Sequence, residues 1–144
     1  MNFSTKLEPY ERSEMLIDAN IFLEVLLEQE SSDACIQFLE NVRSGKIFAT
    51  ISTFTIDGIA LILERHGQKP QEIITFLSSL LNYKGLRIYM PTMNDRLKAA
   101  EHMKLGIDFE DALTIQCAVS NGEKELMSFD KHLDKVSFIK RITP

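Results

Sequence analysis

The chain has 144 residues, the size of one ordinary domain, and it is 44% hydrophobic and 26% charged. Its formal net charge of −5 argues against a broad basic surface for nucleic acid, although a basic rim beside an acidic centre would not show in that total. No apolar run approaches the ~20 residues of a membrane-spanning helix, and residues 1–14 lack a signal-peptide core, so we expect a cytoplasmic protein with no membrane contact.

Short apolar strands and helices alternate along the chain after a polar lead-in over residues 1–14. The predicted strands are 15–18, 47–51, 86–90, 125–129 and, as a possible fifth, 138–142. The predicted helices are 21–27, 31–45, 54–65, 70–82, 92–106 and 108–120. Pro70 suits a first helical turn, and Gly45 and Gly122 suit helix ends.

This alternation predicts an α/β fold in a single domain over residues 15–144. Strands that alternate with helices form parallel sheets with helices on both faces, joined by right-handed crossovers. We therefore expect a three-layer α/β/α domain with a central, mainly parallel sheet of four to five strands.

The cysteines and histidines have ordinary interpretations. Cys35 and Cys117 lie among apolar residues of predicted helices and are expected to be buried free thiols. His66, His102 and His132 lack the spacing of a zinc site. His132 is close to Asp130 in the sequence, but we expect no direct role for it.

Three aspartates follow strands or begin helices. Asp18 ends the first strand, Asp130 ends the fourth, and Asp111 lies in the first turn of a helix. Each could simply cap a helix or complement its dipole. In an open parallel sheet, however, strand C-termini and helix N-termini share one edge, where ligands bind. Three carboxylates at one edge repel each other unless a hard divalent cation such as Mg²⁺ or Mn²⁺ lies between them.

Three segments in this order resemble the motifs of PIN-domain nucleases. They are 15–23 (MLIDANIFL), 108–118 (DFEDALTIQCA) and 128–133 (SFDKHL), and the resemblance covers almost the whole chain from Met15 onward. Many members of this family are toxins of VapBC-type toxin–antitoxin pairs. The resemblance implies a PIN-like fold, a metal-dependent endoribonuclease that cleaves single-stranded RNA, and a homodimer held by a small antitoxin.

The resemblance also implies roles for individual residues. Asp18, Asp111 and Asp130 match the acids that bind the metal and support catalysis. Asn20 and Ser128 match neighbouring polar positions that help to hold ligands or water. Further candidates are Asp108 as a metal ligand, and Lys131 and Lys135 as contacts of the substrate at the rim.

One position departs from the family pattern. The family usually has a glutamate on the helix after the second strand, and Gly58 stands there in this chain, with Asp57 beside it. One step along a helix rotates a side chain by roughly 100°, so Asp57 either replaces the glutamate through a local shift or faces elsewhere. A glycine inside a helix costs about 1 kcal/mol relative to alanine, which suggests that Gly58 has a packing or functional reason.

Two alternatives to an active ribonuclease stay open. Gly58 motivates the first, a catalytically weakened PIN-like domain that binds RNA or a protein partner without cleaving. The second is a phosphatase-like metal hydrolase on a similar sheet. An Asp-x-Asp nucleophile motif would favour it, whereas this chain has Asp18-Ala19-Asn20.

Overall fold

A single five-stranded sheet forms the centre of the molecule. The computed structural model describes residues 13–144, so the lead-in expected over residues 1–14 lies almost wholly outside the described residues. The strand order is β3-β2-β1-β4-β5, and every pairing is parallel. The strands are β1 (Met15–Ile17), β2 (Ala49–Ser52), β3 (Leu86–Tyr89), β4 (Glu125–Met127) and β5 (Lys140–Ile142). The predicted parallel sheet is confirmed, including its fifth strand.

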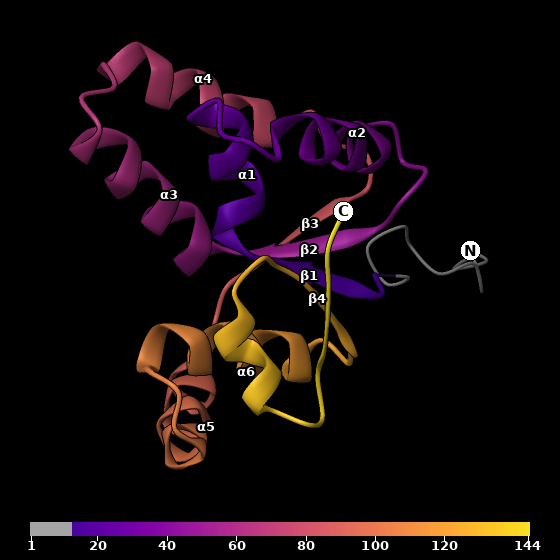
Figure 1. The fold of residues 1–144 in the computed structure, drawn as a ribbon, viewed down its shortest axis with the longest axis vertical. Coiled ribbons are helices and arrows are strands. Elements are labelled where there is room, and N and C mark those ends of the chain that lie inside the picture. Colours follow the sequence, from indigo (N-terminus) through magenta and orange to yellow (C-terminus); the bar gives the residue numbers. More distant parts are fainter. Residues whose placement is uncertain (1–12) are drawn as a thin grey trace, which may run out of the picture.

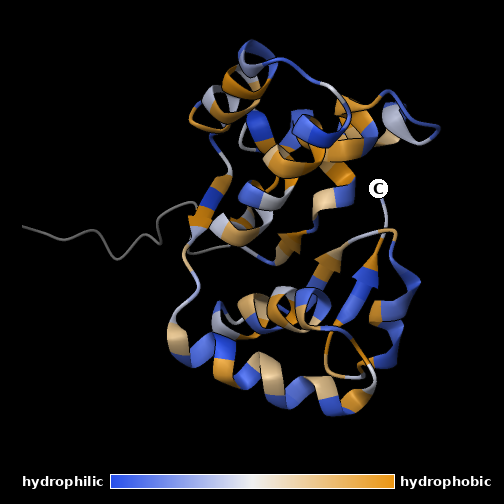
Figure 2. Ribbon diagram, turned by 90° about the vertical axis from the view of Figure 1, so that its left-hand side faces the viewer, coloured by the Kyte–Doolittle hydropathy of each residue, from blue (hydrophilic) through white to orange (hydrophobic). Residues whose placement is uncertain are grey.

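Helices cover both faces of this sheet (Figure 1). One face carries α1 (Ala19–Leu26), α2 (Ser32–Arg43), α3 (Thr53–Arg65) and α4 (Pro70–Leu80). The other carries α5 (Met93–His102), the 3-10 helix η2 (Met103–Leu105), α6 (Phe109–Ser120) and the 3-10 helix η3 (Lys131–Lys135). Most of the helices carry hydrophilic and hydrophobic residues in alternating bands, as expected for helices with one buried stripe (Figure 2). The predicted three-layer α/β/α architecture is confirmed.

Two apolar cores lie on opposite faces of the sheet. Ile17 belongs to the core beneath α1 to α4, and Leu16 belongs to the core beneath α5 and α6. In β4, Met127 and Leu126 divide between the same two cores. Successive residues of a strand point to opposite faces, so a strand covered on both sides needs apolar residues at every position. The burial on both faces therefore explains the apolar pairs Leu16-Ile17 and Leu126-Met127 in β1 and β4.

The helix predicted over 92–106 is divided into two parts. Its α-helical part, α5, ends at His102, and the three residues of η2 form a tighter turn. Gly106 follows with a φ of 86°, in the left-handed region that favours glycine. The predicted end at Gly106 is confirmed, but the last turn is a 3-10 helix.

Within the described part of the chain, no helix is long and apolar enough to span a membrane.

A buried carboxylate joins α5 to β3 and α6. Asp95 is only 3% exposed. It accepts hydrogen bonds from Tyr89 Oη at 2.5 Å, from the backbone N–H of Thr92 at 2.9 Å and from Ser120 Oγ. These donors come from a strand end, a helix cap and the end of another helix, so one side chain fixes the relative positions of three elements.

Candidate metal centre

Asp18 lies at the junction of β1 and α1. Its backbone N–H donates to Met127 O at 3.0 Å, which continues the pairing of β1 with β4 to the edge of the sheet. Its side chain then caps α1, with Oδ1 accepting from the backbone N–H of Ala19 at 2.8 Å. The capping expected from the sequence therefore occurs, and it directs the second oxygen, Oδ2, towards the end of β4.

Ser128 and Asn20 connect Asp18 with the end of β4. Ser128 is fully buried, and its Oγ donates to Asp18 Oδ2 at 2.6 Å. The same Oγ accepts from the backbone N–H of Asp130 at 3.0 Å. Asn20 Nδ2 donates to Asp18 Oδ2 at 3.3 Å and to Ser128 Oγ at 3.1 Å, and its Oδ1 accepts from Phe129 N at 3.2 Å. This network holds the loops after β1 and β4 together.

Asp111 reaches the same edge from the first turn of α6. Asp108 caps this helix, with its Oδ1 accepting from the backbone N–H of Asp111 at 2.9 Å. The cap leaves the half-buried carboxylate of Asp111 free to face the loop after β4. The capping role explains Asp108 without a ligand, whereas Asp111 serves no cap.

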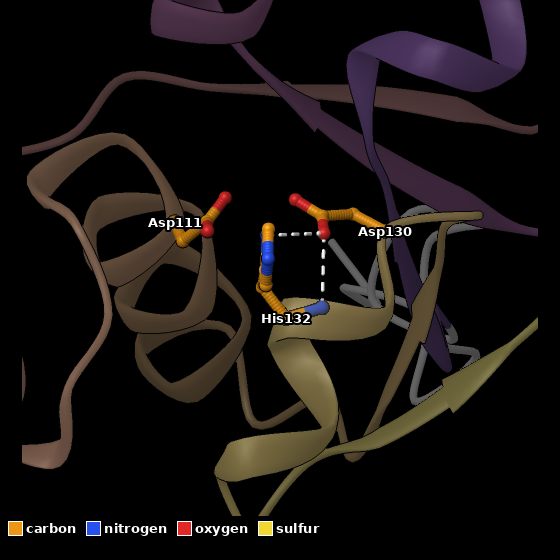
Figure 3. A group of neighbouring side chains, drawn as sticks. All are labelled: Asp111, Asp130 and His132. Carbon is orange, nitrogen blue, oxygen red and sulfur yellow. Dashed lines mark hydrogen bonds and ion pairs between the residues drawn. The ribbon is translucent and has the colours of Figure 1, made fainter.

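Asp130 begins η3 and lies opposite Asp111. Its Oδ1 accepts from the backbone N–H of His132 at 2.9 Å and lies 3.2 Å from His132 Nδ1. One ligand atom each of Asp111, Asp130 and His132 lies within 4.8 Å of the other two. Figure 3 shows the two carboxylates directed towards each other, with the imidazole beside them.

Burial and neighbouring negative charges raise the pKa values of Asp111 and Asp18. Burial, followed by the charges of Asp130, Asp108, Asp18 and Glu110, raises the pKa of Asp111 to about 7. Burial also raises the pKa of Asp18, against the hydrogen bonds from Ser128 and Ala19, and the charge of Asp130 adds to the increase. The three predicted acids, which come from three remote segments, therefore lie in one electrostatically coupled cluster.

A cleft of about 230 Å³ opens beside Asp18. Its wall on α3 contains Gly58, Leu61, Ile62 and Arg65, which share one helical face because their spacing is i, i+3, i+4 and i+7. Its remaining lining residues are Ala19, Phe54, Thr55, Glu110 and Thr114. A Cβ atom at Gly58 would meet nothing within 4 Å, so the space beside this residue is open.

Glu110 is an acid of this site that the sequence analysis did not single out. It lines the cleft together with Asp18, and burial together with the charges of Asp108, Asp18 and Asp130 raises its pKa. Asp57, by contrast, is exposed and is not among the residues that line the cleft. Arg65 follows Gly58 by seven residues on the same helical face, so the helical spacing in the sequence indicates that Arg65 also lines the cleft.

The two predicted rim lysines lie on η3, beside the acids. Lys135 Nζ donates to Gly106 O at 3.2 Å, which ties η3 to the loop before α6. Lys131 is exposed next to Asp130. Neither residue lines the cleft on the α3 side, where Arg65 is the cationic residue.

The donor set fits a hard divalent cation. Ionised carboxylates that are half-buried and mutually repulsive are stabilised when a cation binds between them, and carboxylate oxygens are the ligands that Mg²⁺ and Mn²⁺ use. Asp111, Asp130 and His132 each place a ligand atom within 4.8 Å of the other two, whereas Asp18 is joined to this group through Ser128. Asn20 and Ser128 would act by orienting Asp18 and the backbone of Asp130.

Comparison with known proteins supports one architecture. The family model described as PIN domain matches residues 15–139. None of the curated proteins matches the sequence significantly. Among solved structures, VapC20 of Mycobacterium tuberculosis, described as a toxin that cleaves the sarcin-ricin loop, superposes with a TM-score of 0.72 at 13% identity, over 90% of this chain and 99% of that chain.

Two further structures have the same fold. VapBC2 of Rickettsia felis, solved with a DNA fragment from its promoter, has a TM-score of 0.68 at 14% identity, covering 90% of this chain and 97% of that chain. A toxin–antitoxin complex from Klebsiella pneumoniae has a TM-score of 0.62 at 18% identity, covering 87% and 94%. At these identities the likeness is one of fold.

Proposed function

The chain belongs to the PIN domain family, and from this premise we propose that it is a divalent-metal-dependent endoribonuclease that cleaves single-stranded RNA. The observation that carries the proposal is the convergence of Asp18, Asp111 and Asp130. These residues leave three different elements and share one field of negative charge. A purely structural explanation by helix capping does not account for Asp111, whose carboxylate caps nothing.

The proposed mechanism assigns binding and orienting roles to the residues of this chain. Asp18, Asp111 and Asp130 would hold Mg²⁺ or Mn²⁺, which when bound supplies water activation and charge neutralisation at a phosphodiester. Ser128 and Asn20 would keep Asp18 in place through the hydrogen bonds to its Oδ2. Such fixed carboxylates need little rearrangement during the reaction, which is the usual source of electrostatic catalysis.

The cleft beside Asp18 supports an extended RNA strand as substrate. Arg65 at its wall provides a cation for a phosphate, and Phe54 provides an aromatic face within the same lining. Lys131 and Lys135 would contact phosphates on the other side of the acids. Single-stranded RNA suits such a cleft, because its bases can be splayed out of the helical stack.

We further propose that the protein is the toxin of a toxin–antitoxin pair and acts in the cytoplasm. The support is the shared fold with VapC20 and with the two toxin–antitoxin complexes. A homodimer with a bound antitoxin would also cover exposed apolar side chains. The most exposed of these are Leu81, Met90, Met93 and Leu97.

A cleavage assay with single-stranded RNA tests the proposed activity. Purified protein with Mn²⁺ is expected to cleave RNA internally, and EDTA is expected to stop the reaction. Asp18→Asn should reduce the rate by about a hundredfold or more, since it removes a charge that the cation requires. Asp57→Asn is the matched control, because it removes the same charge from an exposed residue outside the cleft. Cleavage that survives in EDTA or in Asp18→Asn would refute the proposal.

Gly58 favours a second candidate function, an RNA-binding or protein-binding PIN domain that does not cleave. Because Gly58 has no side chain, this part of the cleft wall lacks the glutamate carboxylate that the family usually has. If RNA binds at unchanged affinity with and without Asp18→Asn, and no cleavage occurs with Mg²⁺ or Mn²⁺, this second function replaces the first.

A further inference from the structure

His132 faces two of the three acids. Its Nδ1 lies 3.2 Å from Asp130 Oδ1, and one ligand atom from each of Asp111, Asp130 and His132 lies within 4.8 Å of the other two. Two ligand atoms on opposite sides of an ion, each at about 2.1 Å from it, are about 4.2 Å apart. The two carboxylates and the imidazole are therefore close enough to share one ion after side-chain adjustment.

The position of the imidazole is not required by the fold of η3. The backbone N–H of His132 already donates to Asp130 Oδ1 at 2.9 Å, and this hydrogen bond caps the turn without the ring. The His132 side chain is 75% exposed, so it fills no space in the apolar core. The 3-10 helix η3 therefore places the ring beside the acids, although η3 does not need the ring for its own stability.

The carboxylates have oxygens available on the side that faces the ring. Both contacts between Asp130 and His132 use Oδ1, and Figure 3 shows the other oxygen of Asp130 directed towards Asp111. Among the hydrogen bonds within residues 13–144, none is accepted by the Asp111 carboxylate. The place between these side chains consequently combines two oxygen donors with one nitrogen donor.

We propose that His132 is a nitrogen ligand of the cation site and makes this site prefer Mn²⁺ to Mg²⁺. The inference rests on the proposed function, because it concerns the same site. Mg²⁺ takes oxygen ligands and retains water, whereas imidazole nitrogen suits the transition metals. An imidazole added to the carboxylates of the proposed site therefore raises the affinity for Mn²⁺ and contributes little to the binding of Mg²⁺.

Titration calorimetry with MnCl₂ and with MgCl₂ on the full chain tests this inference without any measurement of cleavage. His132→Asn keeps a hydrogen-bond donor near the position of Nδ1 but replaces the nitrogen ligand with an amide. We expect it to weaken Mn²⁺ binding by about tenfold and to change Mg²⁺ binding by less than about twofold. His66→Asn is the matched control, because His66 is an exposed histidine at the end of α3 whose Nδ1 contacts Ile62 O.

Pulsed EPR of bound Mn²⁺ gives a second readout. A directly bound imidazole produces a hyperfine coupling from ¹⁴N, which should be present in the unmodified protein and in His66→Asn and absent in His132→Asn. A coupling that persists in His132→Asn, or an unchanged ratio of Mn²⁺ to Mg²⁺ affinity, would overturn the inference. If Asp111→Asn abolishes binding of both ions while His132→Asn leaves this ratio unchanged, the site stands and only the histidine ligand is refuted. If neither ion binds the unmodified protein, the proposed metal-dependent function fails together with it.

Discussion

Asp95 and Asp111 lie in the same half of the molecule, but their pKa values are shifted in opposite directions. Burial would raise the pKa of Asp95, but hydrogen bonds from Ser120, Tyr89 and Thr92 outweigh it and lower the pKa to about 2. Asp111 receives no such hydrogen bonds, and burial together with neighbouring negative charges raises its pKa to about 7. Both residues belong to the α5–α6 face of the sheet.

The difference separates a structural acid from a candidate ligand. Asp95 has its charge compensated by donors of the chain, so it holds β3, α5 and α6 together. Asp111 faces Asp130, another acid, and its charge is compensated only when a cation or a proton binds. Burial of a carboxylate is therefore a weaker indication of function than the absence of donors around it.

Replacing Asp95 should give the largest effect on stability, and it tests whether the hydrogen bonds to this carboxylate hold the fold together. Asp95→Ala leaves Tyr89 Oη, Ser120 Oγ and the backbone N–H of Thr92 without their acceptor, and the free energy of unfolding should fall by about 3 kcal/mol. Asp111→Asn, measured without added metal at pH 8, should instead raise it by about 1 kcal/mol or less.

Urea denaturation of the purified variants measures both changes. Glu64→Ala, at an exposed position of α3, is a control that should remain within about 0.5 kcal/mol of the unmodified protein. A stabilising Asp95→Ala, or an Asp111→Asn that destabilises as strongly as Asp95→Ala, would show that the two carboxylates do not differ in how their charges are compensated.

The pH dependence of stability should have opposite signs for the two acids. The folded pKa of Asp95 lies below its ordinary value of 3.8, so its contribution is present above about pH 4 and is lost as the pH falls towards 2. The folded pKa of Asp111 lies above 3.8, so the folded state binds more protons and the free energy of unfolding decreases as the pH rises from about 4 to about 7.

Glu123 complicates this measurement, because burial also raises its pKa to about 7. The informative quantity is therefore the difference in unfolding free energy between Asp111→Asn and the unmodified protein at each pH. This difference should increase in favour of the asparagine between about pH 4 and pH 7 and should shrink when Mn²⁺ is added. A difference that is constant across this range would contradict the raised pKa of Asp111.

The sequence predicted those parts of the molecule that depend on chain direction and apolar pattern. Asp18 and Asp130 follow parallel strands, so the topology alone brings them to one edge. The partners of Asp95 could not be predicted in this way. Tyr89 and Ser120 are remote from each other in the chain, and no periodic pattern indicates that their hydroxyl groups meet at one carboxylate.

The direction of individual side chains on the helices could not be predicted from the sequence either. Asp57 and Gly58 are neighbours in the sequence, yet only Gly58 faces the cleft, because one helical step turns a side chain by roughly 100°. Glu110 and Asp111 differ by the same step, and both contribute to the negative field because the cluster lies across the first turn of α6. The exact phase of a helix relative to its neighbours follows from packing, which the sequence pattern fixes only approximately.

Replacing Glu110 should give the smallest of these effects, since its carboxylate acts on the cluster only through its charge. Glu110→Gln removes one negative charge from the lining of the cleft beside Asp18. One unit charge about 6 Å from a divalent cation contributes about 1.4 kcal/mol in water, and screening at about 0.15 M salt roughly halves this energy. The affinity for Mn²⁺ should therefore fall by about threefold, measured by titration calorimetry. Asp57→Asn removes the same charge on the exposed side of α3 and should leave the affinity unchanged.

Gly58→Glu, which adds an acid where a Cβ meets open space, should restore the affinity of Glu110→Gln. Equal losses in Glu110→Gln and Asp57→Asn would mean that only the total charge of the protein matters, and that the position of an acid relative to the cleft does not.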